Sequence, residues 1–268
     1  MTLNQFTIGT TYYFYVLARS DFGLSDKSNI VNQLAALTPT KPTDVTTVIS
    51  GPNARTGQNV VISWTAPDPR GWAILGYRIY IRQSDSTTYS INLASCDGTT
   101  DANILANARC TVPIAQLVAW PYSLPWGSSV FAKVVAYNGN GDSLISDAGN
   151  GAVILTYPDV PTSLTETVAA RTATSITFTW TAPATNGGTP VIDYDIFYDQ
   201  ALLTWTPLAT RIASTSYTAS QLSPGLKYKF RVQARNAYGN SYDSEEKEIL
   251  CATVPSKPAV PISANVAD

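Results

Sequence analysis

The chain has 268 residues, of which 44% are hydrophobic and 13% are charged, and its formal net charge is −2. So small a charge provides no electrostatic footprint for nucleic acid or for an anionic membrane surface. The sequence contains no histidine, which removes the usual general base and the commonest metal ligand, and no apolar run reaches the ~18 residues of a transmembrane helix. We therefore expect no catalysis, no metal or other cofactor, and no membrane insertion in this segment.

The first predicted strand lies in a stretch that the chain repeats. Gly9–Gly23 and Gly225–Gly239 align without a gap, and both read G-x-x-Y-x-F-x-V-x-A-R-x-x-x-G. A third copy, Gly127–Gly141, has Val130 where the other two have tyrosine. Apolar and polar residues alternate with period two in these stretches, which predicts strands with one buried face.

Two further blocks precede the second and third copies. The block "VVISWTAP" ends at Pro67 and "ITFTWTAP" ends at Pro183, and each is followed by a turn and another alternating block, Ile74–Arg82 or Val191–Asp199. Stiff proline-rich linkers separate the units, and their threonine and serine residues are candidate sites of O-linked sugar. Several short alternating strands at this spacing predict an all-β fold of serial β-sandwiches.

These residues as a set resemble the fibronectin type III domain family. The resemblance rests on a tryptophan in the second strand, a Gly-Tyr or Asp-Tyr pair in the third, and L-x-P-G-x-x-Y-x-F-x-V-x-A-R-N in the sixth. It covers nearly the whole chain and implies tandem fibronectin type III (immunoglobulin-like) β-sandwiches. It also implies that Trp64 and Trp180 fill the cores and that Tyr12 and Tyr228 make corner hydrogen bonds. Val130 departs from the pattern, so we expect the middle unit to hold this corner differently.

The middle unit also resembles a variant found in tandem arrays of large protist cell-surface proteins. This narrower resemblance rests on three short motifs: "CDG" at Cys96–Gly98, "CTVP" at Cys110–Pro113 and "GNGA" at Gly149–Ala152. It implies a cell-surface setting for the array.

The linkers divide the chain into four parts. We predict a partial module with only its last strands in residues 1–38, a complete enlarged module in 39–156, a complete compact module in 157–254, and a linker with the first strand of a following module in 255–268. Incomplete modules at both ends imply either a window of a longer array or a chain that takes strands from a neighbour.

The cysteines indicate a redox setting. Cys96 and Cys110 enclose a polar loop that has little apolar surface to hold itself. We predict a disulfide there, which would stabilise the module by about 3 kcal/mol and indicate an oxidising, extracellular location. The alternative is two free thiols. Cys251 is left over, either as a buried free thiol or as a link between chains.

Three carboxylates in "DYDIFYD" are a candidate calcium site. Alternation turns Asp193, Asp195 and Asp199 outward, however, and the third and sixth strands are neighbours in the family that the chain resembles. The outward residues of the last sixth strand include Lys229 and Arg231, so we predict cross-strand ion pairs on a solvated face instead of a metal site.

The outward residues of the sixth strands differ among the three copies. Tyr13, Tyr15 and Leu17 make the first copy aromatic, whereas the middle copy is mixed aromatic and basic. The outward residues of the middle unit are Arg78, Tyr80, Arg82, Phe131, Lys133, Val135 and Tyr137. Exposed aromatic patches tend to mark contact sites, so these faces are candidate partner contacts. The alternative is that aromatic residues are simply good strand formers.

The segment Ile114–Trp126 is an insertion rich in tryptophan and proline before the middle sixth strand. It either packs on its own module or presents Trp120 and Tyr122 to a partner, and the sequence leaves both alternatives open.

The most consistent function is structural. We predict a component of an extracellular or cell-surface fibre or coat, whose modules act as rod segments and whose aromatic faces mediate assembly. Its partners would be other copies of itself or neighbouring modules of a longer chain, and glycans are further candidates. An adhesion receptor ectodomain that binds a protein or glycan ligand, and spacer modules of a secreted carbohydrate-active enzyme, remain alternatives because fold alone does not decide function.

Overall fold

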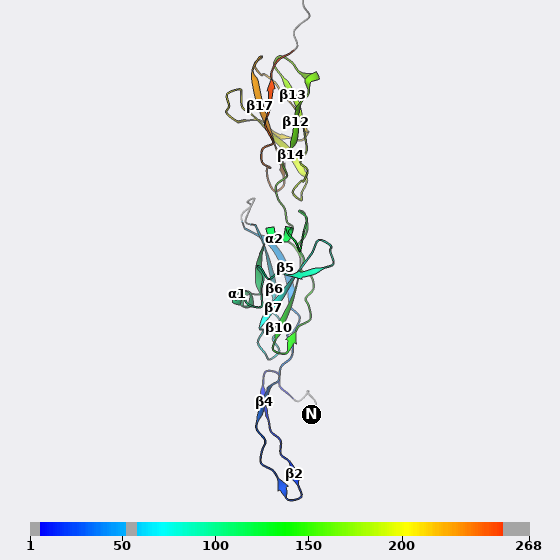
Figure 1. Cartoon of the computed structure of the whole chain (residues 1–268), viewed down its shortest axis with the longest axis vertical. Helices are drawn as coiled ribbons and strands as arrows, with labels where there is room; N and C mark the ends of the chain where they lie inside the picture. The colour runs from blue at the N-terminus through cyan, green and yellow to red at the C-terminus, as the bar shows by residue number, and fades with distance from the viewer. Residues whose placement is uncertain (1–5, 52–57, 254–268) are drawn as a thin grey trace, which may run out of the picture. The chain divides into compact units, whose positions relative to one another are not determined.

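The structure, a computed structural model, describes residues 6–51 and 58–253 and divides into two compact units, Met1–Ile154 and Leu155–Asp268. The first unit holds a hairpin (residues 6–38) and the middle sandwich (the strands β5 to β11), and the second unit holds the last sandwich (the strands β12 to β18) (Figure 1). The strand predicted within 255–268 lies outside the described residues. Among the helices that the structure describes, none is long and apolar enough to cross a membrane.

The last sandwich has a three-stranded and a four-stranded sheet. The first has the order β12-β13-β16, with the bounds Thr162–Glu166, Ile176–Thr181 and Ser216–Ala219. The second has the order β15-β14-β17-β18, with the bounds Thr206–Ile212, Val191–Tyr198, Lys227–Asn236 and Lys247–Leu250. A short 3-10 helix, Val168–Ala170, follows β12. The sixth strand in chain order, β17, lies between β14 and β18 and is antiparallel to both.

Alternating side chains explain why these segments are strands. In β13 the buried residues Ile176, Phe178 and Trp180 are separated by threonines, which favour extended backbone. Every second residue of β17 is buried from its second position to its end. The rings of Phe178 and Phe230 meet across the core with centroids 4.6 Å apart. Because each such side chain contributes roughly 1.5–3 kcal/mol when fully buried, the inner faces hold the two sheets together.

The middle sandwich has the same arrangement. Its three-stranded sheet has the order β5-β6-β9, with the bounds Thr43–Ser50, Asn59–Thr65 and Arg109–Pro113. Its four-stranded sheet has the order β11-β10-β7-β8, with the bounds Gly141–Asp142, Ala132–Asn138, Gly76–Arg82 and Tyr89–Ile91. Trp64 lies in the core in an edge-to-face contact with Tyr77, with ring centroids 5.0 Å apart.

Two short helices enlarge the middle sandwich. The helix α1 (Ala102–Asn107) lies between β8 and β9, and Asp101 caps it by accepting the backbone N–H of Asn103 (2.8 Å). The helix α2 (Ile114–Val118) follows β9 and buries two of its residues. A disulfide joins Cys96, which precedes α1, to Cys110 on β9.

The glycines of "GNGA" allow the end of the middle sandwich to approach its first strand. A Cβ atom placed on Gly149 would lie 1.8 Å from the carbonyl oxygen of Val45 on β5. Beside it, the buried Thr47 hydroxyl donates to the carbonyl of Val130 and accepts the N–H of Ala152, both at 3.0 Å. Side chains larger than hydrogen at position 149 would therefore separate these segments.

The hairpin consists of β1 (Thr11–Phe14) paired with β4 (Val31–Leu34), and of the short strands β2 (Arg19–Ser20) and β3 (Gly23–Leu24) nearer its tip. In Figure 1 it is the blue two-stranded ribbon, and no second sheet covers it in the part of the chain that the structure describes. Large apolar side chains on both of its faces are consequently exposed.

Candidate contact surfaces

The corner tyrosines make the same hydrogen bond in the hairpin and in the last sandwich. The Tyr228 hydroxyl accepts the backbone N–H of Ser223 (2.9 Å), and the half-buried Tyr12 hydroxyl accepts that of Thr7 (2.8 Å). In the middle sandwich the residue five positions before Val130 is Pro125, which has no N–H to donate. A tyrosine at Val130 would thus have no donor there. Pro125 is the signal in the sequence that explains the departure at Val130.

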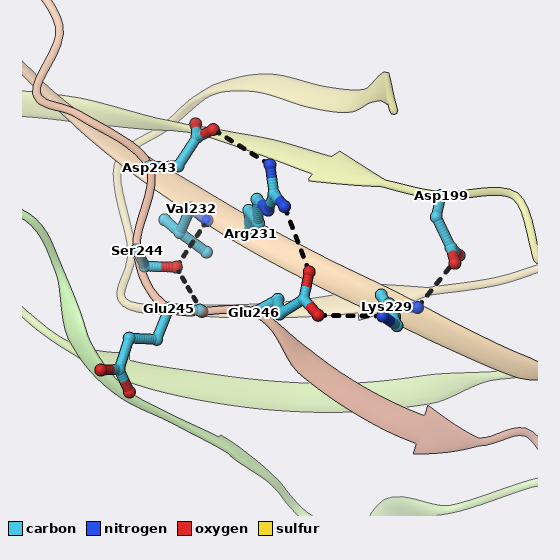
Figure 2. A network of polar contacts seen from close by, with 8 residues as sticks. All are labelled: Asp199, Lys229, Arg231, Val232, Asp243, Ser244, Glu245 and Glu246. Carbon is cyan, nitrogen blue, oxygen red and sulfur yellow. Dashed lines mark hydrogen bonds and ion pairs between the residues drawn. The ribbon is translucent and has the colours of Figure 1, made fainter. Parts of the chain in front are cut away.

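Two serines fasten each sixth strand to the segment that follows it. In all three copies, the sixth strand donates two backbone N–H groups to the hydroxyls of an S-x-x-S motif, at 2.8–3.0 Å. The motifs are Ser25–Ser28, Ser143–Ser146 and Ser241–Ser244. Figure 2 shows one such bond, from Val232 to Ser244, whose hydroxyl in turn donates to the Glu245 carbonyl. These serines were not among the predicted residues, although their equal spacing is visible in the repeat.

The outward face of β17 carries a network of ion pairs. Lys229 Nζ lies 2.9 Å from Glu246, and the Arg231 guanidinium lies 3.1 Å from Glu246 and 3.4 Å from Asp243 (Figure 2). Arg231 also stacks on the ring of Trp205, 3.8 Å from the ring centroid. Hydrogen bonds from Lys229 and then from Arg231 lower the pKa of the Glu246 carboxyl. The cations on this face are therefore neutralised by residues of their own domain.

The source of these carboxylates differs from the sequence prediction. We expected the third-strand aspartates to pair with the cations, but only Asp193 does so, through a two-pronged contact with Arg235. Asp199 is buried beyond the end of β14, where it accepts the backbone N–H groups of Ala201 and Lys229, each at 3.0 Å. Figure 2 shows the second of these bonds. Its carboxylate satisfies a turn in the backbone, which a strand-alternation argument does not anticipate.

Cations stack on aromatic rings on the outward face of the middle sandwich. Arg82 lies 3.6 Å from the ring centroid of Phe131, and Arg78 lies 4.7 Å from that of Tyr137. Lys133 covers Tyr89 in the same way, and Arg78 also pairs with Asp142 at 2.6 Å. Tyr80 is half-buried on the same face, and Val135, expected to point outward, is buried. Four of the candidate contacts thus form two stacked pairs within the sandwich, Arg78 with Tyr137 and Arg82 with Phe131.

Of the outward faces of the hairpin and the two sandwiches, that of the hairpin has the fewest contacts among its own side chains. The side chain of Tyr13 is 67% exposed, and Tyr15 and Leu17 are exposed too. Lys27 lies 4.6 Å above the Tyr15 ring, and no ion pair joins residues of the hairpin in its described part. This face combines exposed aromatic area with few competing internal contacts.

The two candidate contacts in the insertion of the middle sandwich, Trp120 and Tyr122, differ in their exposure to solvent. Trp120 is 87% exposed. Tyr122 is buried at 3% exposure, and its carbonyl accepts the N–H of Ser84 (2.9 Å). Of the two alternatives left open for the insertion, Tyr122 takes the first: it packs with Leu117 and Leu124 in the core cluster of its own sandwich, and burial raises its pKa.

The cysteines take two different states. Cys96 and Cys110 form the disulfide, and Cys251 is a fully buried free thiol whose Sγ–H donates to the Ala173 carbonyl (3.3 Å). Burial raises the pKa of the Cys251 thiol. A link between chains through Cys251 would require the last sandwich to open. Within the described ranges, no group of three or more potential ligands is placed to hold a metal ion.

Comparison with known proteins agrees with this architecture. The family model described as "Fibronectin type III domain" matches residues 159–249, which span nearly all of the last sandwich. The chain is 27% identical to the "Tyrosine-protein phosphatase Lar-like" of Caenorhabditis elegans over 91% of its length, and 30% identical to "Chitinase A1" of Niallia circulans over 67%. It is 32% identical to the human "Cell adhesion molecule-related/down-regulated by oncogenes" over 41% of its length.

The chain spans only a small part of these relatives, from 8% of the adhesion protein to 26% of the chitinase. The comparisons identify no catalytic domain in this chain, and they support a modular role, extracellular or structural. Residues 159–249 form a fibronectin type III domain, and they lie within a chain that is a tandem array of β-sandwich domains.

Proposed function

We propose that the chain is a structural component of an extracellular or cell-surface fibre or coat, which assembles through its tandem β-sandwich modules. The observation that carries this proposal is the outward face of the hairpin. At the positions where the last sandwich has the ion-paired Lys229 and Arg231, the hairpin has the exposed Tyr13 and Tyr15.

Exposed aromatic side chains of this kind contribute strongly to protein contacts, because they bury a large apolar area at a small cost in conformational entropy. The outward faces of the two sandwiches are occupied by their own cation–ring and ion-pair contacts, so they compete less well for a partner. The partner of the aromatic face in this proposal is another copy of the chain or a neighbouring module of a longer chain. The disulfide supports an oxidising location such as the cell surface.

Sedimentation velocity over a range of protein concentrations, together with negative-stain electron microscopy, tests this proposal. We expect wild-type chains to associate and the double variant Tyr13→Lys, Tyr15→Arg to remain monomeric, because it receives the cations of the last sandwich. Leu144→Lys, which changes another exposed apolar residue on the middle sandwich, is the matched control and should associate like wild type. A monomeric wild type at all concentrations, or equal loss in both variants, would contradict the proposal.

An adhesion receptor ectodomain is a second candidate, because one relative is named as a cell adhesion molecule. In that case the exposed Trp120 and the aromatic face of the hairpin would contact a protein or glycan ligand. The match to a chitinase also supports the alternative of a spacer in a carbohydrate-active enzyme. A membrane anchor in the full gene product would favour the receptor, a catalytic domain the spacer, and a long series of further modules the fibre.

A further inference from the structure

The hairpin reproduces strands six and seven of the last sandwich, bond for bond. Its residues correspond to those of the last sandwich at a constant offset, so that Tyr12 corresponds to Tyr228. The pairing register is the same, with Thr11 opposite Leu34 and Lys227 opposite Leu250. The turn before the strand also matches: the N–H of Gly9 donates to Ala35 and that of Gly225 to Cys251, both at 2.7 Å. With the corner and serine bonds described above, this identity shows that the hairpin has the same backbone arrangement as strands six and seven of the complete last sandwich.

Within residues 6–51 and 58–253, no sheet covers the inner face of the hairpin. In the last sandwich the inner residues Phe230 and Val232 are fully buried, whereas the corresponding Phe14 and Val16 are 41% and 72% exposed. Beside Phe14 lies a hollow of about 500 Å³, lined among others by Phe6, Ile8, Tyr12 and Leu34. Exposed contiguous apolar surface of this kind marks interaction sites in other proteins.

The free edge of β1 has the pattern of a strand that awaits a neighbour. Successive amides in a strand point to opposite sides, and those of Val16 and Ala18 donate to the serines on the β4 side. The amides of Tyr13, Tyr15 and Leu17 therefore point to the other edge. In the last sandwich that edge of β17 is paired with β14 along most of its length. Without such a neighbour, β1 ends at Phe14 while β17 extends for 10 residues.

Arg19 indicates what the missing neighbour carries. The corresponding Arg235 pairs with the buried Asp193 directly opposite on β14. In the middle sandwich the same two positions hold Tyr137 and Gly76, and a Cβ atom on Gly76 would lie 2.6 Å from the Tyr137 hydroxyl. The two sandwiches thus combine arginine with aspartate and tyrosine with glycine.

Arg19 has no ion pair among the described residues. By the pairing rule of the two sandwiches, its counterpart on the neighbouring strand is an acidic residue, because glycine there would leave the guanidinium without a partner.

We propose that the inner face and free edge of the hairpin bind the front half of a fibronectin type III module, strands one to five, whose third strand has an aspartate at the position of Asp193. A complete sandwich of a second copy is not its source, because β10 or β17 already covers the front half there. The source is a front half that lacks its own sixth and seventh strands. The inference does not depend on the proposed fibre, which uses the opposite face of the hairpin.

The test extends the full chain by the front half of its own last sandwich. Residues 155–221 are joined in front of Phe6 in place of residues 1–5, because Phe6 corresponds to Leu222. Hydrogen exchange followed by mass spectrometry then compares this chimera with wild type. We expect exchange across Tyr13–Leu17 to slow by ~100-fold or more when the edge is paired and buried. The unchanged last sandwich of the same chain is the internal control.

Two further variants test the choice of partner. Asp193→Gly in the added copy alone should remove most of the protection, as should Arg19→Ala, and the combination should cost no more than either change by itself. A chimera whose added segment stays unfolded, or whose hairpin exchanges as fast as in wild type, overturns the proposal. Protection in wild type that rises with concentration overturns it too, because a second copy would then be the occupant. Equal protection with glycine and aspartate overturns the acidic requirement.

Discussion

The sixth strands of the two sandwiches, β10 and β17, have equally buried inner faces but different outer faces. On β10 Tyr137, and directly before it Phe131, accept stacked arginines, whereas on β17, Lys229 and Arg231 meet carboxylates from the following segment. Because alternate side chains of a strand point to opposite sides, one face can hold the core while the other changes freely. The difference shows that the fold depends on the inner pattern and leaves the outer surface free to vary.

The corners extend the same comparison to the backbone. In the last sandwich the Tyr228 hydroxyl accepts the backbone N–H of Ser223. In the middle sandwich Val130 is combined with Pro125, which has no N–H that would need an acceptor. The two positions change together, because a buried hydroxyl without a donor would cost more than an apolar side chain of its own.

The largest expected effect separates a covered from an uncovered inner face. Phe230→Ala should lower the free energy of unfolding of the last sandwich by about 3–5 kcal/mol, because it removes a fully buried ring. The matched change Phe14→Ala in the hairpin should have a much smaller effect, since Phe14 is exposed. Native-state hydrogen exchange of the slowest amides in each part measures both. Equal losses would show that the hairpin already has a core.

The next effect distinguishes the two sandwiches by their covalent bonds. Cys96→Ser with Cys110→Ser should destabilise the middle sandwich by about 3 kcal/mol, because the disulfide limits the freedom of the unfolded loop. Urea unfolding followed by hydrogen exchange should show no change in the last sandwich, which has only the free Cys251. The distinction fails if both sandwiches lose stability together, or if wild-type Cys96 and Cys110 are alkylated without reduction.

A smaller effect tests the corners. Tyr228→Phe should lower the free energy of unfolding of the last sandwich by about 1 kcal/mol, because it removes one hydrogen bond and leaves the N–H of Ser223 without its acceptor. In the middle sandwich, Val130→Tyr should bring no gain and a loss of about 1–3 kcal/mol, because Val130 is fully buried and Pro125 has no N–H. A stabilised Val130→Tyr variant would contradict the role assigned to Pro125.

The smallest effect concerns acid stability. The pKa of Glu246 is lower in the folded protein, so its pairs stabilise the last sandwich above the ordinary glutamate value of 4.5, and this contribution is lost as the pH falls through the lowered pKa. Glu246→Gln should therefore reduce the fall in the melting temperature of the last sandwich below pH 4.5.

Glu245 provides the control for that measurement, because its carboxylate points away from Lys229 and Arg231 in Figure 2. Glu245→Gln should leave the acid response unchanged. High salt should weaken the Glu246 effect, since these pairs are partly exposed. An acid response that is the same in both variants and in wild type would remove Glu246 from the explanation.

Much of the fold followed from local pattern. Period-two alternation placed Ile176, Phe178 and Trp180 on one face, and a family resemblance identified the sixth-strand tyrosines; the structure shows those three residues buried and Tyr228 in its corner. The outer surface was less predictable. The sequence left open whether Tyr122 packs on its own module or faces a partner, and it lies in the core because its loop folds back on the middle sandwich.

Which side chains share a strand face could be predicted from the sequence, because that depends only on neighbours along the chain. The three-fold repeat and the loop that the disulfide closes are visible there too. Which groups meet across strands depends on the tertiary structure instead: Glu246 and not Asp199 neutralises Lys229, and Phe14 is exposed whereas Phe230 is buried. Such contacts join residues far apart in sequence, and the path of loops and the presence of a neighbouring strand determine them.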